Sequence, residues 1–428
     1  MGIFGSLFGE KGEKGKHYAA LEIGSRKLRG LLFSHGEGDS LVLEELVQVP
    51  YEERKGRATG LLTVDAGAIE RAAKTLLEKL PRFAKVRNVS VGLGAEFLRS
   101  ITFRAVFERD EPKEKIDAAE LKNLLEKAER ASRESIGEKL LRQNGPEVNL
   151  RLVSSRLEEI LIDGYGVNDP VGLAGKEIEI ALFNLYTEEP HLEFLQAIKK
   201  LLGIKNLFPR SLPYNVCRAH ASFAPTSLPY SGIFIGVDEA LTSVSVVSKN
   251  VFLGMKLFSI GRNLFTRSIG ENLGLGFKEA EDMQRQYAGG KLSVQVSRKI
   301  SGILKRASSV WATGVELALE EFSQALEIFP SAIFVYGEGA DLPDLIRVLN
   351  ETDRFAQIPF LEKRTPVVLA PADLPFFKGD KDLKKFSGIS TSSADTPICC
   401  LAYVSLFDTG PSGELARIVQ RATRLAYS

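Results

Sequence analysis

Residues 163–175, Asp163-Gly-Tyr-Gly-Val-Asn-Asp-Pro-Val-Gly-Leu-Ala-Gly175, are the most informative stretch of the chain. Glycine adopts backbone angles that are closed to other residues, and proline fixes its own φ, so this composition is typical of tight turns. The flanking segments 149–162 and 176–186 carry recurring apolar residues and predict β-strands. We therefore expect a re-entrant turn between two strands, in which the glycines and the proline have a structural role.

Working outward, the sequence predicts two β-hairpins in comparable positions. The first pairs residues 17–24 with 26–33 around Gly24-Ser25, and the second pairs 233–237 with 243–247 around residues 238–242. Their correspondence suggests a remote duplication and hence a pair of related lobes. Hydrophobic periodicity and turn residues predict further helices at 66–80, 116–135, 191–202 and 343–349, a helix-rich block at 278–328, strands at 86–92, 97–107 and 332–336, and a polar surface loop at 378–397.

Composition limits the class of protein. A chain of 428 residues exceeds what one hydrophobic core usually organises, and 44% hydrophobic with 26% charged residues is typical of a soluble globular protein. A net charge of +1 argues against a nucleic-acid partner. The three cysteines, Cys217, Cys399 and Cys400, have neither disulfide nor metal spacing and fit a reducing cytosol. No apolar run is long enough to span a bilayer.

Five further motifs, taken in order with residues 163–175, resemble the bacterial cell-division protein FtsA from about His17 to Phe407. These motifs are Glu22–Arg29, Val91–Gly94, Ser259–Thr266, Glu279–Asp282 and Tyr336–Pro343. The resemblance implies an α/β fold of the actin-like, two-lobed kind, with mixed sheets flanked by helices and a small FtsA-type inserted subdomain. It divides the chain into an N-terminal amphipathic segment and linker (1–16), a first lobe (17–87 and 188–230, with 397–410 returning to it), the inserted subdomain (88–187), a second lobe (231–396) and a C-terminal amphipathic helix (411–428).

The same resemblance implies a site for ATP and Mg²⁺ between the lobes. In such proteins the two hairpin turns bind phosphates through backbone N–H groups, and a carboxylate before each turn holds the metal. The corresponding magnesium ligands are Glu22 and Asp238. The corresponding nucleotide-binding residues are Gly24, Ser25, Arg26, Asp238, Thr242, Gly261, Glu281, Gln284, Arg285, Gly337, Glu338 and Gly339.

Several substitutions put that nucleotide site in doubt. Gly236 stands where the family has the metal-binding aspartate, Asp238 and Glu239 occupy glycine positions, and Glu338 replaces the middle glycine of its turn. Two unit charges about 4 Å apart interact by roughly 4 kcal/mol at an effective dielectric near 20, so these acids oppose a triphosphate. Asp238 is either a displaced metal ligand or a solvated residue of a lobe that has lost its nucleotide. We expect weak or lost ATPase activity and assign no catalytic residue.

Both ends of the chain are amphipathic. The N-terminus carries Ile3, Phe4, Leu7 and Phe8, and a C-terminal helix would have one apolar and one basic side. Two alternatives remain open for the C-terminal helix, namely a membrane surface or the protein's own body. The expected C-terminal membrane-binding residues are Leu415, Arg417, Ile418, Val419, Arg421, Ala422, Arg424 and Leu425.

The function that the resemblance implies is that of an FtsA-like adaptor on the inner face of the cytoplasmic membrane. Such an adaptor links FtsZ filaments to the membrane during division and self-associates into filaments, with other division or pilus proteins binding the inserted subdomain. One alternative is a PilM-like scaffold of a pilus or secretion machine, which binds a short partner peptide at that subdomain. Another is an active ATP phosphotransferase, which the missing catalytic base and Gly236 disfavour.

Overall fold

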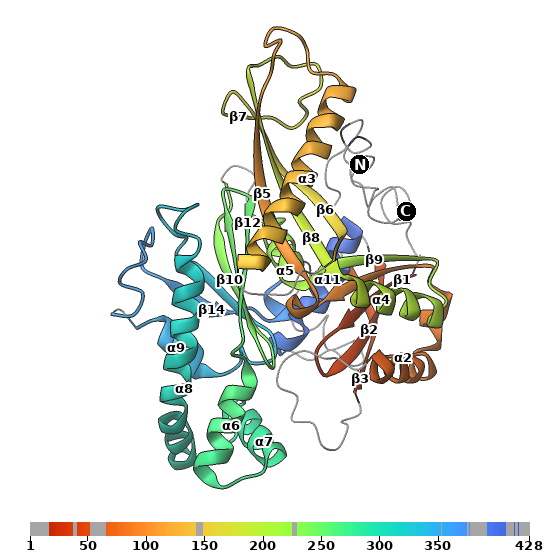
Figure 1. Cartoon of the computed structure of the whole chain (residues 1–428). Coiled ribbons are helices and arrows are strands. Elements are labelled where there is room, and N and C mark those ends of the chain that lie inside the picture. Colours follow the sequence, from red (N-terminus) through yellow and green to blue (C-terminus); the bar gives the residue numbers. More distant parts are fainter. Residues whose placement is uncertain are drawn as a thin grey trace.

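The computed structural model describes residues 17–36, 41–51, 66–142, 149–224, 229–351, 353–374, 376, 392–407, 415 and 418. Predictions for residues 1–16, for most of the polar loop 378–397 and for most of the C-terminal helix fall outside these residues. The described chain forms three sheets with helices packed on them (Figure 1).

The first sheet has the strand order β3-β2-β1-β4-β9. The predicted first hairpin is confirmed, and β1 also pairs in parallel with β4. Gly30 faces Leu76 of helix α2, whereas Gly92 faces Leu212 and Leu401 of helices α5 and α11, so helices cover both faces. The sheet and its helices form the first lobe: β1 (His17–Ile23), β2 (Lys27–His35), β3 (Leu41–Pro50), α2 (Ala66–Lys79), β4 (Asn88–Leu93), α4 (Glu189–Leu201), β9 (Asn206–Ser211), α5 (Leu212–Ala221) and α11 (Thr396–Phe407).

The second sheet repeats this arrangement, in the order β12-β11-β10-β13-β14. Its first three strands are antiparallel and its last three are parallel, as in the first sheet. The two hairpins are therefore equivalent, which confirms the prediction of related lobes. The second lobe comprises β10 (Gly232–Val237), β11 (Thr242–Ser248), β12 (Val251–Phe258), α6 (Arg262–Leu273), α7 (Phe277–Ala288), α8 (Val294–Glu320), β13 (Ala332–Tyr336), α9 (Pro343–Leu349) and β14 (Thr365–Val368).

The third sheet projects from the first lobe between β4 and α4 (Figure 1). Its order is β5-β8-β6-β7, from β5 (Arg99–Glu108), β6 (Leu150–Ile162), β7 (Tyr165–Gly166) and β8 (Glu177–Glu188), and α3 (Ala118–Arg142) packs on it. The inserted segment was expected to begin at residue 88, whereas β4 (Asn88–Leu93) pairs with β1 and β9 in the first sheet. The inserted strands thus start at β5, because residues 88–93 complete the parallel part of the first sheet.

The stretch 163–175 lies at the far end of this third sheet. Asp163 and Gly164 have positive φ at the turn between β6 and β7, and Gly172 has φ +87°. The Asp163 carboxylate accepts hydrogen bonds from the backbone N–H groups of Lys176 (2.9 Å) and Glu177 (2.8 Å), which fixes the return into β8. The structural role predicted for this stretch is confirmed.

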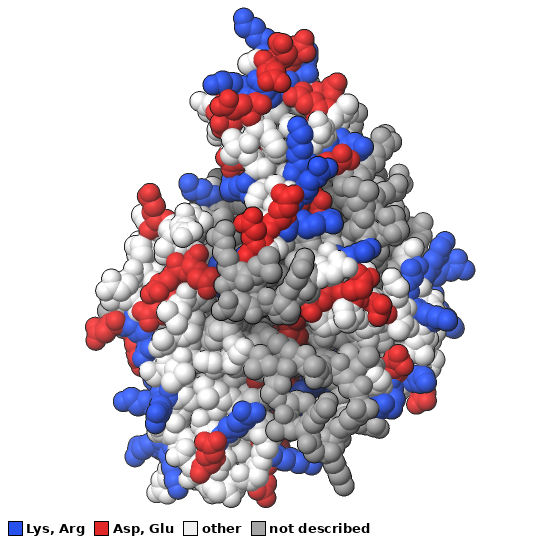
Figure 2. All heavy atoms as spheres, in the orientation of Figure 1, with Lys and Arg blue, Asp and Glu red and all other residues white. Residues whose placement is uncertain are grey.

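Each lobe has its own apolar core, and the third sheet has a smaller one with α3. Acidic and basic side chains are interspersed at the tip of the third sheet (Figure 2). Among the described residues no helix is long and apolar enough to cross a membrane.

Candidate functional site

The two hairpin turns lie close together where the two lobes meet, and charged side chains join them. Arg26 in the first turn lies with its Nε 3.4 Å from Oε2 of Glu239 in the second turn. On the other side Arg262 Nη2 lies 3.2 Å from Glu239 Oε1 and 2.5 Å from Glu281 Oε1. Arg26, Glu239, Arg262 and Glu281 thus form a row of alternating charges from the first lobe to α7.

A second set of ion pairs starts from the same hairpin. Lys27 pairs with Glu338, which lies in the glycine turn after β13. Arg29 pairs with Glu22. Its Nη1 also lies 3.0 Å from Oδ1 of Asp395, the residue just before α11. Glu22, a candidate magnesium ligand, is therefore buried against a guanidinium.

The space of the missing aspartate is filled by the protein. A Cβ built on Gly236 would lie 2.6 Å from Ser243 Oγ and 2.8 Å from the hydroxyl oxygen of Tyr336. These contacts are shorter than side chains tolerate without displacement. An aspartate at this position would require the side chains of Ser243 and Tyr336 to move, since Tyr336 of β13 packs directly against β10.

Backbone donors at the second turn are also used within the chain. The N–H groups of Arg262 and Asn263, at the start of α6, each donate at 2.8 Å to the carbonyls of Asp238 and Glu239 respectively. Gly261 permits this close approach, because a Cβ there would lie 2.4 Å from the Asp238 carbonyl oxygen. The helix N-terminus, which commonly binds anions, faces the chain's own carbonyls.

Three predicted nucleotide ligands have other contacts. Thr242 is fully buried, donates to the Ile260 carbonyl (2.6 Å) and accepts from Trp311 Nε1 (2.9 Å). Gln284 is buried and accepts from the Thr266 hydroxyl. Arg285 is 69% exposed and pairs with Asp282 of its own helix. Of the other candidates, Glu281 lies within α7 and pairs with Arg262, and the rest belong to turns or helix starts at or beside these two hairpins: Gly24, Ser25, Arg26, Asp238, Gly261, Gly337, Glu338 and Gly339.

The electrostatics of the cleft reflect crowded acids. Burial raises the pKa of Asp238 well above its usual range, and the neighbouring Glu96 and Glu22 raise it further. Burial raises the pKa of Glu96 to about 7, with smaller contributions from Glu22 and Glu239. Burial also opposes ionisation of Glu338, but Lys27 and Arg29 outweigh it and lower the pKa of that carboxyl.

These residues do not fit a magnesium nucleotide. The basic side chains at the two turns pair with carboxylates of the chain, and the position of the second metal-binding carboxylate is filled. No group of three or more metal-ligating side chains occurs within the described residues. A phosphate chain entering here would have to displace Glu239 and Glu338 from their cationic partners.

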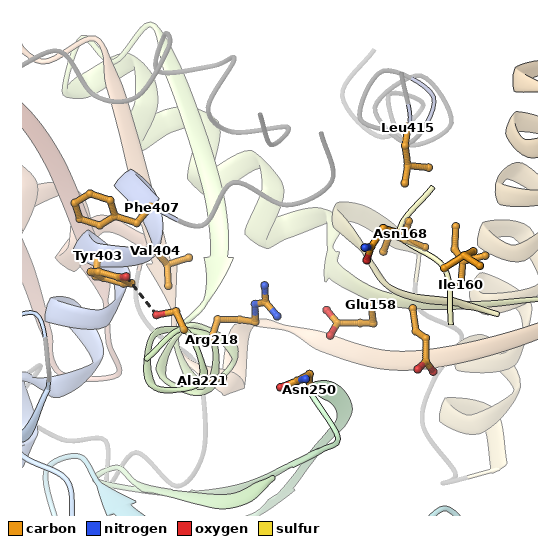
Figure 3. A pocket seen from close by; sticks show the side chains of 14 residues that line it. Glu158, Ile160, Asn168, Arg218, Ala221, Asn250, Tyr403, Val404, Phe407 and Leu415 are labelled. Carbon is orange, nitrogen blue, oxygen red and sulfur yellow. Dashed lines mark hydrogen bonds between the residues drawn. The ribbon is translucent and has the colours of Figure 1, made fainter. Parts of the chain in front are cut away.

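A second candidate site is a cavity of about 470 Å³ between the third sheet and the first lobe. Figure 3 shows Arg218 of α5 and Glu158 of β6, two of the residues that line it, pointing toward each other. Tyr214 donates to Glu158 Oε1 at 2.6 Å, and the Phe252 N–H donates to Oε2 at 3.2 Å, so this carboxylate is held in place. The cavity is lined by Leu157, Glu158, Glu159, Ile160, Val167, Asn168, Arg218, Ala221, Ser222, Asn250, Tyr403, Val404, Phe407 and Leu415.

Sequence reasoning missed this cavity, because its walls come from segments up to 258 positions apart, from Leu157 to Leu415. The one available signal is Glu158 itself, one of two adjacent acids that lie between the apolar residues Leu157 and Ile160 of this strand. Burial raises its pKa, and nearby Arg218 and the Tyr214 hydroxyl oppose that rise. A buried acid is stable only where hydrogen-bond partners compensate its burial, and Glu158 has such partners in Tyr214 and the Phe252 N–H.

The structure also places part of the C-terminal segment. Leu415 and Ile418 are only 3% and 5% exposed and pack in the apolar core of the third sheet. The two alternatives for this helix were a membrane surface and the protein's own body, and these two side chains pack against the body. The remaining predicted membrane residues lie outside the described part of the chain.

No protein-family model matches the sequence, and no curated protein matches it. Solved structures do match. One, the "PilM-PilN type IV pilus biogenesis complex", has a TM-score of 0.61 and 14% identity, covering 91% of this chain and 98% of that one. MreB5 of Spiroplasma citri bound to ADP has a TM-score of 0.45 and 12% identity, covering 90% and 95%. EutJ from Carboxydothermus hydrogenoformans has a TM-score of 0.44 and 11% identity, covering 91% and 89%.

The chain therefore has the actin-like fold, with two related lobes, mixed sheets flanked by helices and a third sheet inserted in the first lobe. This confirms the fold that the resemblance to FtsA implies. The FtsA identity itself is not supported by the comparisons and stays a proposal.

Proposed function

We propose that the chain is an actin-fold scaffold, similar in role to PilM, that binds a short segment of a partner protein in the cavity between the third sheet and the first lobe. The observation that carries this proposal is the cavity itself. It combines an apolar wall from α11 with a fixed carboxylate and an arginine, which suits a peptide with apolar side chains and backbone polar groups.

The likeness to PilM supports the proposal through its fold. The likeness covers 91% of this chain and 98% of that one. That structure is of a PilM-PilN complex, so a PilN-type protein is the first partner to test. In this role the protein assembles a membrane machine rather than turning over ATP.

An FtsA-like adaptor is the second candidate, because residues 163–175 and the other quoted motifs resemble that family. In this version the chain links FtsZ filaments to the inner face of the cytoplasmic membrane, and copies of the chain associate into filaments. Both candidates place it peripherally on the membrane. An active phosphotransferase is disfavoured, since the residues at the two turns do not fit a magnesium nucleotide.

The test is isothermal titration of the full chain with the PilN-type protein and, separately, with FtsZ of the same organism. We expect binding by PilN that Ala221→Arg weakens at least about tenfold, because the added side chain enters the cavity from the end of α5. Ala288→Arg is the matched control, as Ala288 also ends a helix and is half-buried but lies in the second lobe.

Binding of FtsZ without binding of PilN would favour the FtsA-like adaptor over the PilM-like scaffold. Binding of neither protein, or PilN binding that Ala221→Arg leaves unchanged, would contradict a scaffold that uses this cavity.

A further inference from the structure

We propose that ion pairs within the chain hold the two lobes together where the actin-like fold binds a nucleotide, with the carboxylates of Glu239 and Glu338 taking the role of the phosphates. Closure of the lobes is then a property of the polypeptide and does not depend on ATP. The lobes close in this way whichever partner the cavity binds.

Glu239 is the centre of the first connection. It contacts Arg26 of the first lobe and Arg262 of the second, so one anion joins cations from both sides. Glu239 and Arg262 are each only 12% exposed. Charge pairs that water reaches poorly interact more strongly than surface pairs, and removing one partner leaves the other buried and unpaired.

Lys27 and Arg29 make two further connections from the same hairpin. Lys27 pairs with Glu338 in the second lobe. Arg29 donates to the Ala394 carbonyl at 2.8 Å and pairs with Asp395. Ser393, two residues before Asp395, donates to Asp341 of the second lobe at 2.7 Å. Arg26 and Lys27 of this hairpin therefore contact acids of the second lobe directly. Arg29 is connected to the second lobe through residues 393–395.

The same arrangement disfavours a nucleotide. Its phosphates would meet Asp238, Glu239 and Glu338 together, while the amides that start α6 are already bonded to carbonyls. The glycine turn is likewise closed against β10, since a Cβ on Gly337 would lie 2.8 Å from the Val237 carbonyl oxygen. The basic side chains that would neutralise phosphate in a nucleotide-binding site are neutralised here by Glu239 and Glu338.

The experiment measures the distance between spin labels at Glu78→Cys in α2 and Lys278→Cys in α7, two exposed positions on different lobes. The native cysteines are buried and do not compete for the label. We expect one narrow distribution in the unmodified cleft, unchanged by millimolar Mg-ATP. The pair Glu239→Gln and Glu338→Gln should raise the population of longer distances about tenfold.

A charge exchange separates the ion pair from general damage. Lys27→Glu alone should open the lobes, and Lys27→Glu with Glu338→Lys should restore the narrow distribution. Asp282→Asn is the control, since it removes an acid that pairs with Arg285 on the surface of α7 only. Shorter label-to-label distances in Mg-ATP would overturn the proposal, as would distances that the two glutamine substitutions leave unchanged. Failure of the Lys27→Glu, Glu338→Lys exchange to restore the narrow distribution would overturn it too.

Discussion

Among single residues, Glu96 is an acid close to the two turns whose pKa lies near neutral pH. Burial raises it from 4.5 to about 7, and Glu22 and Glu239 add to the rise. The folded protein therefore holds this proton more tightly than the unfolded chain. Its contribution to stability is complete below about pH 4.5 and is lost as the pH rises through about 7, by at most about 3 kcal/mol.

Glu96→Gln removes this titration. We expect the free energy of unfolding of the variant, relative to the original chain, to increase between about pH 5 and about pH 8, since only the original chain must bury a charge there. Urea denaturation at both pH values measures it, with Glu78→Gln on the exposed side of α2 as the control. A difference that is the same at both pH values would show that Glu96 ionises freely in the folded state.

At the scale of elements, the sequence was most informative where periodicity is strong. The hairpins, the helix at 66–80 and the strand at 332–336 were predicted from alternation and helical spacing, because each buries one regular face. Strands β3 and β12 were not predicted, since Glu44 and Glu45 interrupt the alternation of apolar and polar residues in β3 and Gly254 interrupts it in β12. The ion pairs were not predictable, because Arg26 and Glu239 meet only after two lobes have folded.

The C-terminal segment is the element whose role is most open to experiment. Leu415 and Ile418 dock on the third sheet, whereas Arg417, Arg421 and Arg424 are predicted to face an anionic membrane surface. Each arginine contributes about 1 kcal/mol near such a surface. Changing all three to glutamine should therefore weaken binding to anionic vesicles about 100-fold in co-sedimentation.

Glutamine at Lys113, Lys127 and Arg130 removes the same charge from exposed positions in or beside α3 and serves as the control. An equal loss in both variants would mean that only net charge matters. Full pelleting of a chain without residues 1–10 and 414–428 would remove the termini as anchors.

In the molecule as a whole, the third sheet contacts both lobes. It is inserted in the first lobe, and Thr102 of β5 donates to the Phe252 carbonyl of β12 at 2.9 Å. The Phe252 N–H in turn donates to Glu158, which lines the cavity. A segment bound in the cavity would therefore rest on a body that the interlobe ion pairs hold in one arrangement.

Hydrogen–deuterium exchange of the full chain tests the central claim, that this actin fold binds a partner at the third sheet and not a nucleotide in its cleft. The chain is compared alone, with millimolar Mg-ATP and with the PilN-type protein. We predict slower exchange at residues 157–168 and 212–222 with PilN, and unchanged exchange at 22–29 and 236–242 with Mg-ATP. Protection of the two turns by Mg-ATP, with none around the cavity, would contradict the account.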